Sequence, residues 1–504
     1  MSSEVHKKHS YGQILKASSI IGGAQGINYL ISMVRVKLVA VLLGPSGVGL
    51  VGLYVSATGL VSTVAGLGIS SSGVREVAEA HSGGDAEKIA RTVKTLRRVC
   101  WVTGILGWLL CAAFSYPLSL WTFGSGEHAW AIAILGATLL FGAISGGQSA
   151  LLQGTRRIGD IARLNVFGAI IGTIATVGLY GWLGQKGIVP VLIITAAVNL
   201  GCSWWFARRI QMLRVVQSWR ETIANSRRLV SLGLAFMYSA LLGAIVGLAI
   251  RSLIVRKLGL DASGIYQAAW GISGVFAGFI LGAMGTDFYP RLAAAAQDNE
   301  HVNRLVNEQT EIGVLLALPG LLGTLAFAPW VMHIFYSAKF LSGANLLPWF
   351  VLGVLGQVIT WPMSFIMFAK GASGWLSVYG TVFNIIHLAL VVVLLKSMGL
   401  AGCGVAFAII YALHIGGLLL LSRHLTGFRW TPHTVKLLLY GTGLIGTAYV
   451  FVWLLSPALA AVCSSFLLVA TAIFSLRGII LRLGADHRLV VRLMGLPGFK
   501  LLAA

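Results

Sequence analysis

The sequence predicts an all-α polytopic membrane protein of about 14 transmembrane helices, in two pseudo-symmetric six-helix lobes followed by a C-terminal helix pair. Three observations predict this fold. Runs of twenty or more apolar residues recur from Ile14 almost to Leu483, and a helix needs about 20 such residues to cross roughly 30 Å of hydrocarbon. Hydrophobic residues make up 57% of the chain and charged residues 10%, with a mean hydropathy of +0.86. Related motifs also recur in the two halves of the chain.

Each apolar run ends at a breaker or a charged turn, and these ends separate the individual helices. The first run follows Lys7 and Lys8, as in a signal peptide, but it is far longer than an h-region and no cleavage motif interrupts it. We therefore interpret it as a retained helix. The helices are expected near residues 14–43, 47–73, 95–122, 128–153, 160–183, 187–209, 229–255, 263–288, 310–336, 343–368, 373–396, 400–422, 434–456 and 458–480.

Lys and Arg residues concentrate on one side of the predicted helices. With the N-terminus in the cytoplasm, most of the 37 Lys and Arg residues fall in cytoplasmic segments, which is the positive-inside pattern of membrane proteins. This pattern accounts for most of the net charge of +22 and predicts that both termini are cytoplasmic. Nucleic acid is not an expected partner, because the chain lacks a hydrophilic, charge-rich surface. The outer turns hold Lys186, Arg256, Lys257, Lys339 and Lys396.

The chain is also predicted to be duplicated, at a spacing of about 216 to 220 residues. Because each half holds six spans, both halves enter the membrane in the same direction, as in transporters built from parallel repeats. The predicted parts are an N-lobe (1–212), a basic cytoplasmic linker (213–228), a C-lobe (229–424), and a helix pair with a basic cytoplasmic tail (425–504). The matching motifs are Val36-Lys37-Leu38 with Pro45-Ser46-Gly47-Val48, and Arg256-Lys257-Leu258 with Ala262-Ser263-Gly264-Ile265.

The first predicted helix has one polar face. Ser18, Gln25, Asn28, Ser32 and Arg35 fall within about a 100° arc of a helix that turns 100° per residue. In lipid such a face must turn toward protein or toward a water-filled cavity, because unpaired polar groups in hydrocarbon are costly. The alternative to a cavity is hydrogen bonding between neighbouring helices.

Cations lie within the predicted spans. Arg35 and Lys37 lie roughly 12 and 9 Å from the outer end of the first span at 1.5 Å per residue, and Arg251 lies at a similar depth in the seventh. Arg256 and Lys257 add positive charge at the outer mouth. These side chains either snorkel to the interface or line a cationic cavity for an anionic substrate, in which the planar fork of Arg suits a phosphate.

Other residues give weaker signals. Asp287 and Glu311 are candidates for ion coupling or are solvated helix ends, and His387 and His414 either relay protons or pack between helices. The five cysteines lie in apolar runs without pairwise spacing, so neither disulfides nor a metal site is predicted. No Walker motif occurs in the sequence, and we expect no cofactor.

Two regions of the chain resemble a known family. Residues 35–50, which read RVKLVAVLLGPSGVGL, resemble the opening signature of Wzx-type polysaccharide flippases, in the multidrug/oligosaccharidyl-lipid/polysaccharide (MOP) exporter superfamily. The segments Arg256-Lys257-Leu258, Gly264-Ile265-Tyr266-Gln267 and Tyr289-Pro290-Arg291-Leu292 are similar to the seventh and eighth helices of that family.

The resemblance implies a two-lobed transporter and not an enzyme. It would move an undecaprenyl-diphosphate-linked oligosaccharide, such as an O-antigen, enterobacterial-common-antigen-like or exopolysaccharide repeat unit, across the bacterial inner membrane. Lys37 and Arg256 occupy motif positions, and Gln267 extends the polar face of the expected cavity. Coupling to an H⁺ or Na⁺ gradient is implied, and membrane lipids, a polysaccharide polymerase and a chain-length regulator are the implied partners.

Alternatives remain open at this stage. A peptidoglycan lipid II flippase or a cation-coupled multidrug exporter of the same superfamily would share the architecture. The first lobe lacks a carboxylate deep in a span, which disfavours the drug exporter. A glycosyltransferase, polymerase or ligase would need acidic catalysts and a sizeable outer loop, whereas the predicted outer turns are short. A scaffold that only recruits partners would need no cavity between the lobes.

Overall fold

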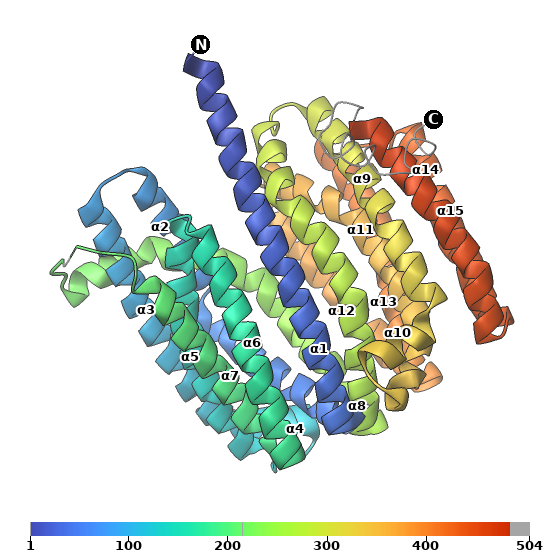
Figure 1. Ribbon diagram of the computed structural model, residues 1–504, viewed down its shortest axis with the longest axis horizontal. Helices are drawn as coiled ribbons and strands as arrows, with labels where there is room; N and C mark the ends of the chain where they lie inside the picture. Colours follow the sequence, from blue (N-terminus) through green and yellow to red (C-terminus); the bar gives the residue numbers. More distant parts are fainter. Residues whose placement is uncertain (1, 214, 484–504) are drawn as a thin grey trace. The chain divides into compact units, whose positions relative to one another are not determined.

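Figure 1 shows a computed structural model that describes residues 2–213 and 215–483. All regular elements in these residues are helices, which confirms the predicted all-α membrane class. The chain divides into two compact units, Met1–Gly264 and Ile265–Ala504. The helix α8 (Trp219–Ala294) begins within the segment predicted as a linker and contributes residues to both units.

The first unit contains seven further α-helices and one short 3₁₀ turn among its described residues. Helix α5 packs between α3 and α7, and α1 packs along α6. These elements are α1 (Ser2–Gly66), α2 (Ile69–Ser82), α3 (Ala86–Ala113), α4 (Ser115–Phe123), α5 (Ala129–Gly154), α6 (Ile158–Leu183), the 3₁₀ turn η1 (Gly184–Gly187) and α7 (Ile188–Ala207).

In the second unit, α11 packs against α9 and α13, and both α14 and α15 pack against α9. A buried cluster to which α9 and α11 contribute includes Phe288, Met363 and Phe428, whose side chains are 2% exposed or less. The elements are α9 (Asn299–Ala326), α10 (Ala328–Phe335), the 3₁₀ helix η2 (Ala338–Asn345), α11 (Leu347–Ala369), α12 (Ser373–Met398), α13 (Ala401–Thr426), α14 (Pro432–Leu454) and α15 (Pro457–Leu483).

Ten stretches of the described residues are long and apolar enough to cross a membrane. Two of them, Gly26–Gly66 and Ile158–Ala207, each overlap two of the predicted spans. Large apolar side chains lie on the outside of these helices, including Ile174 at 68% exposed and Trp182 at 81% exposed. A water-soluble protein rarely exposes so much apolar surface, so the chain is a multi-pass membrane protein. The total of 14 spans stays a prediction.

The two longest helices, α1 and α8, share a sharp kink. In α1 the backbone breaks at Gly44 (φ 69°, ψ −175°), immediately before Pro45, and in α8 it breaks at Gly259 (φ 87°, ψ 176°). Positive φ at both positions requires glycine, since a Cβ would be strained there. The two kinks fall at the turns that the sequence predicts between the first and second spans and between the seventh and eighth. The same irregularity at matching positions is what a duplicated chain should show.

Within the first unit, α8 approaches the backbone of its neighbours at two glycines. A Cβ on Gly49 would lie 2.9 Å from the backbone nitrogen of Gly264. A Cβ on Gly233 would lie 3.2 Å from the carbonyl carbon of Gly68, in the turn between α1 and α2. Small residues permit such close approach of helices in membranes. The first unit's part of α8 therefore packs tightly against α1 at one point and against the turn between α1 and α2 at another.

Candidate functional site

The polar face predicted on the first helix lies on α1, before the kink at Gly44. Arg35 is half-buried, and none of the described residues makes a hydrogen bond or ion pair with its guanidinium. The hydroxyl of Tyr180 on α6 is within electrostatic range of Arg35. Lys37 is half-buried and has an interaction partner. A half-buried cation without a protein partner is costly, and an anionic ligand would offset that cost.

Asn28 lies on the same face and carries an unmet acceptor. Its Oδ1 is buried, and no donor among the described residues reaches it. Buried amide oxygens almost always accept a hydrogen bond, so this atom suits a ligand hydroxyl or a water molecule. Ser32 is half-buried one turn further along. The side chain of Gln25 lies outside the described residues.

The cations of α8 differ in their surroundings. Arg251 is half-buried, and its Nη1 donates to the carbonyl of Gly247 at 3.0 Å. Arg256 is exposed, and its Nη2 donates to the carbonyls of Leu120 and Trp121, the latter at 2.6 Å. Both carbonyls lie in the last turn of α4, where that of Leu120 also accepts from the N–H of Gly124 and that of Trp121 also accepts from the hydroxyl of Ser252. Arg256 therefore stabilises the end of α4, a role that the sequence did not suggest.

The predicted cations occupy similar places relative to the two kinks. Arg35 and Lys37 precede Gly44 by nine and seven residues, and Arg251 precedes Gly259 by eight. At 1.5 Å per residue, all three lie about 10 to 14 Å along the helix from its kink. Lys257 is exposed close to the second kink. All five predicted cations belong to the first unit.

The remaining predicted residues belong to the second unit. Gln267 is half-buried on α8. The carboxylate of Glu311 on α9 accepts from Nε of Arg482 at 2.8 Å and from the hydroxyl of Thr434 at 2.7 Å. The side chains of Glu311 and Arg482 are 12% and 21% exposed. Glu311 is thus engaged in a half-buried ion pair between α9 and α15. The side chain of Asp287 lies outside the described residues.

The two histidines lie in aromatic surroundings. Nδ1 of His414 on α13 is hydrogen-bonded to the hydroxyl of Tyr379 on α12 at 2.8 Å, and its ring stacks on Phe383 with centroids 4.2 Å apart. His387 lies half-buried on α12, with its ring centroid 6.3 Å from that of Phe407. These contacts fit the packing alternative at least as well as a proton relay.

Sequence reasoning missed the polar network around Glu311. The amide oxygen of Asn307 accepts from the backbone N–H of Thr431, the N-cap of α14, at 3.0 Å. It also lies 3.0 Å from the hydroxyl of Thr434, whose single proton it shares with Glu311. The amide nitrogen of Asn307 donates to the carbonyl of Arg429 at 3.1 Å. The signal in the sequence was the spacing of Asn303, Asn307 and Glu311, which places them on one face of α9.

The family of the chain follows from its sequence. Residues 14–296, more than half of the chain, match the family described as polysaccharide biosynthesis protein. The chain belongs to this family. The match spans the two kinked helices and their cations, including both regions that resemble the flippase family.

Curated relatives of this chain include the lipid III flippases of Escherichia coli (strain K12) and Shigella flexneri. Each is 22% identical over 344 residues, which is 67% of this chain and 80% of the relative. Solved structures show the same fold. The lipid II flippase MurJ in an inward closed conformation matches with a TM-score of 0.68 at 14% identity, covering 92% of this chain and all of that one.

An inward-facing multidrug resistance MATE family transporter of the MOP superfamily matches with a TM-score of 0.63 at 15% identity, covering 81% of this chain and 95% of that one. The family match bears out the resemblance to a polysaccharide family, and these solved structures show that the chain has their fold. The relatives are flippases and transporters, in agreement with the prediction that the chain is not an enzyme.

Proposed function

We propose that this protein is a flippase that moves an undecaprenyl-diphosphate-linked oligosaccharide from the cytoplasmic to the periplasmic leaflet of the bacterial inner membrane. Membership of the polysaccharide biosynthesis family and the likeness to lipid III flippases support a lipid-linked sugar as substrate. The observation that carries the proposal is Arg35, a half-buried cation that has no anionic partner among the residues that the structure describes. Both termini are cytoplasmic in this proposal, following the distribution of Lys and Arg.

The mechanism that fits is alternating access. The diphosphate must leave water while the polyprenyl tail stays in lipid, and burying two phosphate charges is the main cost of that transfer. Arg35, Lys37 and Arg251 offset the cost by hydrogen bonds to phosphate oxygens, which guanidinium groups can make in pairs. Asn28 and Ser32 would bind the first sugar or the diphosphate oxygens. Substrate speeds the transition only if it binds the intermediate state better than the resting states.

Coupling to a proton or sodium gradient remains part of the proposal. Glu311 can couple only if its ion pair with Arg482 opens during transport, because both of its oxygens are engaged. Asp287 and His387 are the other candidates. A polysaccharide polymerase and a chain-length regulator are proposed as partners that take up the translocated repeat units.

The proposal is tested with purified protein in proteoliposomes. A fluorescent undecaprenyl-diphosphate oligosaccharide is placed in one leaflet, and its transfer is followed by quenching from outside, with and without an imposed H⁺ or Na⁺ gradient. We expect transfer of the oligosaccharide lipid above the rate of empty liposomes. Transfer of lipid II alone would instead assign a peptidoglycan precursor flippase, and export of a cationic dye alone would assign a multidrug exporter.

A further inference from the structure

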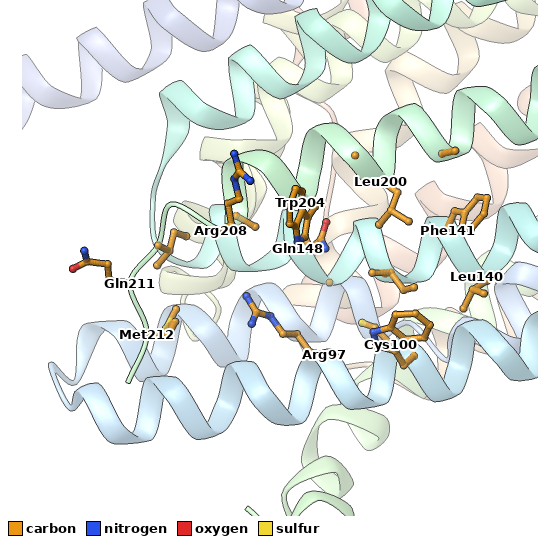
Figure 2. Close-up of a pocket in the computed structure, with 17 residues that line it drawn as sticks. Arg97, Cys100, Leu140, Phe141, Gln148, Leu200, Trp204, Arg208, Gln211 and Met212 are labelled. Atoms are coloured by element: carbon orange, nitrogen blue, oxygen red, sulfur yellow. The ribbon is translucent and has the colours of Figure 1, made fainter. Parts of the chain in front are cut away.

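The first unit holds a groove that the proposed transport path does not use. It has a volume of about 1010 Å³ and lies between α3, α5 and α7, with the segment after α7 at one end. Figure 2 shows its lining residues, with Arg97, Arg208 and Gln211 gathered at one end and Leu140, Phe141 and Leu200 at the other. The groove is therefore amphipathic along its length.

The polar end of the groove is strongly cationic. None of the 17 lining residues is acidic, and two of them are arginines. The guanidinium of Arg208 lies over the ring of Trp205, 3.7 Å from its centroid, and 4.7 Å from that of Trp204. Within residues 2–213 and 215–483, neither Arg97 nor Arg208 has a hydrogen bond or ion pair from its side chain. Two guanidinium groups thus lie at one end of a groove with no carboxylate to neutralise them.

The dimensions of the groove match one leaflet of a bilayer. From Ala197 on α7 to Arg208, the residue that follows this helix, its lining extends about 17 Å at 1.5 Å per residue. Half of a 30 Å hydrocarbon core is about 15 Å. Trp101 and Trp204, each 52% exposed, are among its lining residues. A chain of lipid length fits with its polar end at the arginines.

The polar end also lies beside the segment that leads into α8. Nζ of Lys94 donates to the carbonyl of Val215 at 2.6 Å, and Nε2 of Gln217 donates to the hydroxyl of Thr95 at 2.8 Å. Met212, from the start of this segment, lines the groove. A ligand bound there would touch α3, α7 and the connection to α8 together.

We propose that this groove binds an anionic phospholipid, with its phosphate held by Arg97 and Arg208 and one acyl chain along Leu140, Phe141 and Leu200. Basic pockets between helices at the cytoplasmic side of a membrane protein are suited to such headgroups. The positive-inside distribution places the basic ends of α3 and α7 at that side. The lipid is a ligand distinct from the transported substrate, and it stabilises the packing of α3 and α7 and the connection to α8.

Native mass spectrometry of the full chain in detergent tests the proposal, with dioleoylphosphatidylglycerol and dioleoylphosphatidylcholine as paired probes. We expect phosphatidylglycerol to be retained and to raise the unfolding midpoint, since a ligand of the folded state stabilises it. The double variant R97Q/R208Q should bind phosphatidylglycerol on the order of tenfold more weakly. The control R91Q/R163Q removes the same charge from arginines that pair with Glu87 and Asp160 outside the groove.

A steric variant tests the groove without altering charge. A Cβ on Gly201 would meet no atom within 4 Å, so the side chain of Gly201→Leu would occupy the groove without disturbing α7. Gly178→Leu on α6 is the control, because its Cβ also meets nothing and Gly178 lies outside the groove. We expect Gly201→Leu alone to lose phosphatidylglycerol.

Several results would overturn the proposal. Equal retention of the two phospholipids would show that charge is not recognised, and equal binding by R97Q/R208Q and R91Q/R163Q would place the lipid elsewhere. Stabilisation by glycerol 3-phosphate equal to that by phosphatidylglycerol would assign a soluble phosphate. Preferential retention of undecaprenyl phosphate over phosphatidylglycerol would assign the groove to a polyprenyl carrier instead.

Discussion

The Cα of Gly264 packs directly against the carbonyl group of Pro45, which brings α8 and α1 into backbone contact beyond their kinks. A Cβ on Gly264 would lie 2.6 Å from the carbonyl carbon of Pro45. That distance is too short for a real side chain, and backbone on both sides leaves nothing that can rotate away. The crossing of these two helices therefore depends on the absence of a side chain at residue 264.

Replacing Gly264 by alanine should destabilise the protein by about 1–3 kcal/mol, the usual cost of overpacking. Gly243→Ala on the same helix is the matched control, because its Cβ meets nothing within 4 Å. That change should be neutral or stabilise by on the order of 0.5–1 kcal/mol, since alanine favours helix over glycine. Unfolding in detergent measures both variants. Equal stability of the two would contradict the close contact.

The ion pair of Glu311 and Arg482 gives a second prediction. Breaking a buried pair typically costs about 3–5 kcal/mol, because the remaining charge is left without a partner. Both side chains here are less than a quarter exposed, so Glu311→Gln should destabilise toward the lower end of that range. The double variant Glu311→Gln with Arg482→Gln should recover part of the loss, and unfolding of the four proteins completes a double-mutant cycle.

Transport separates a structural role of Glu311 from a coupling role. If Glu311 only joins α9 to α15, the folded fraction of Glu311→Gln should transport at the native rate and keep its response to a gradient. If Glu311 couples an ion, the gradient response should vanish in protein that is still folded. Gradient dependence in proteoliposomes decides between these results.

The helices and their kinks could be predicted from the sequence, whereas the partners of the charged residues could not. Apolar runs fix where helices form, and Gly44 with Pro45 marks a break by local chemistry alone. By contrast, Arg256 contacts α4, 135 residues away in sequence, and Glu311 contacts Arg482, 171 residues away. Such pairs depend on how helices pack, which hydropathy does not encode. Arg97 and Arg208 fit the positive-inside pattern, so the sequence carries no separate signal for the groove that they line.

The stability of the first turn of α9 at acid pH should depend on Asp298, which caps this helix. Its Oδ1 accepts from the backbone N–H of His301 at 3.0 Å, and this hydrogen bond, with the nearby positive charges, holds the pKa of Asp298 below its usual value. A depressed folded-state pKa means that the cap contributes fully above the unfolded pKa, near 4, and is lost as pH falls through the folded pKa. Asp298→Asn should keep a cap without this pH dependence.

Hydrogen exchange at the first turn of α9 measures the effect of Asp298 locally. Native protein should lose protection there below about pH 4, and Asp298→Asn should show protection that varies less with pH over the same range. Protection at the first turn of α3 can be measured for comparison, because the side chain of Asp85 caps that helix through the N–H groups of Glu87 and Lys88. Acid-independent protection at α9 in the native chain would contradict the assigned cap.

Arg35 and Arg256 should respond in opposite ways to the same substitution. Arg35→Gln removes a half-buried charge that has no partner among the described residues, so stability should stay equal or rise. Arg256→Gln removes hydrogen bonds to the last turn of α4 and should cost about 1 kcal/mol of stability.

The effects of the two substitutions on the rate of flipping should be reversed, with Arg35→Gln the more damaging. A charge-assisted hydrogen bond contributes about 1.5–3 kcal/mol, so Arg35→Gln should slow transfer of the oligosaccharide lipid by roughly 10- to 100-fold. Arg256→Gln should transfer it nearly as fast as native protein once the folded fraction is matched. A stable Arg35→Gln variant that flips at the native rate would remove Arg35 from the substrate path and leave snorkelling to the membrane surface as its role.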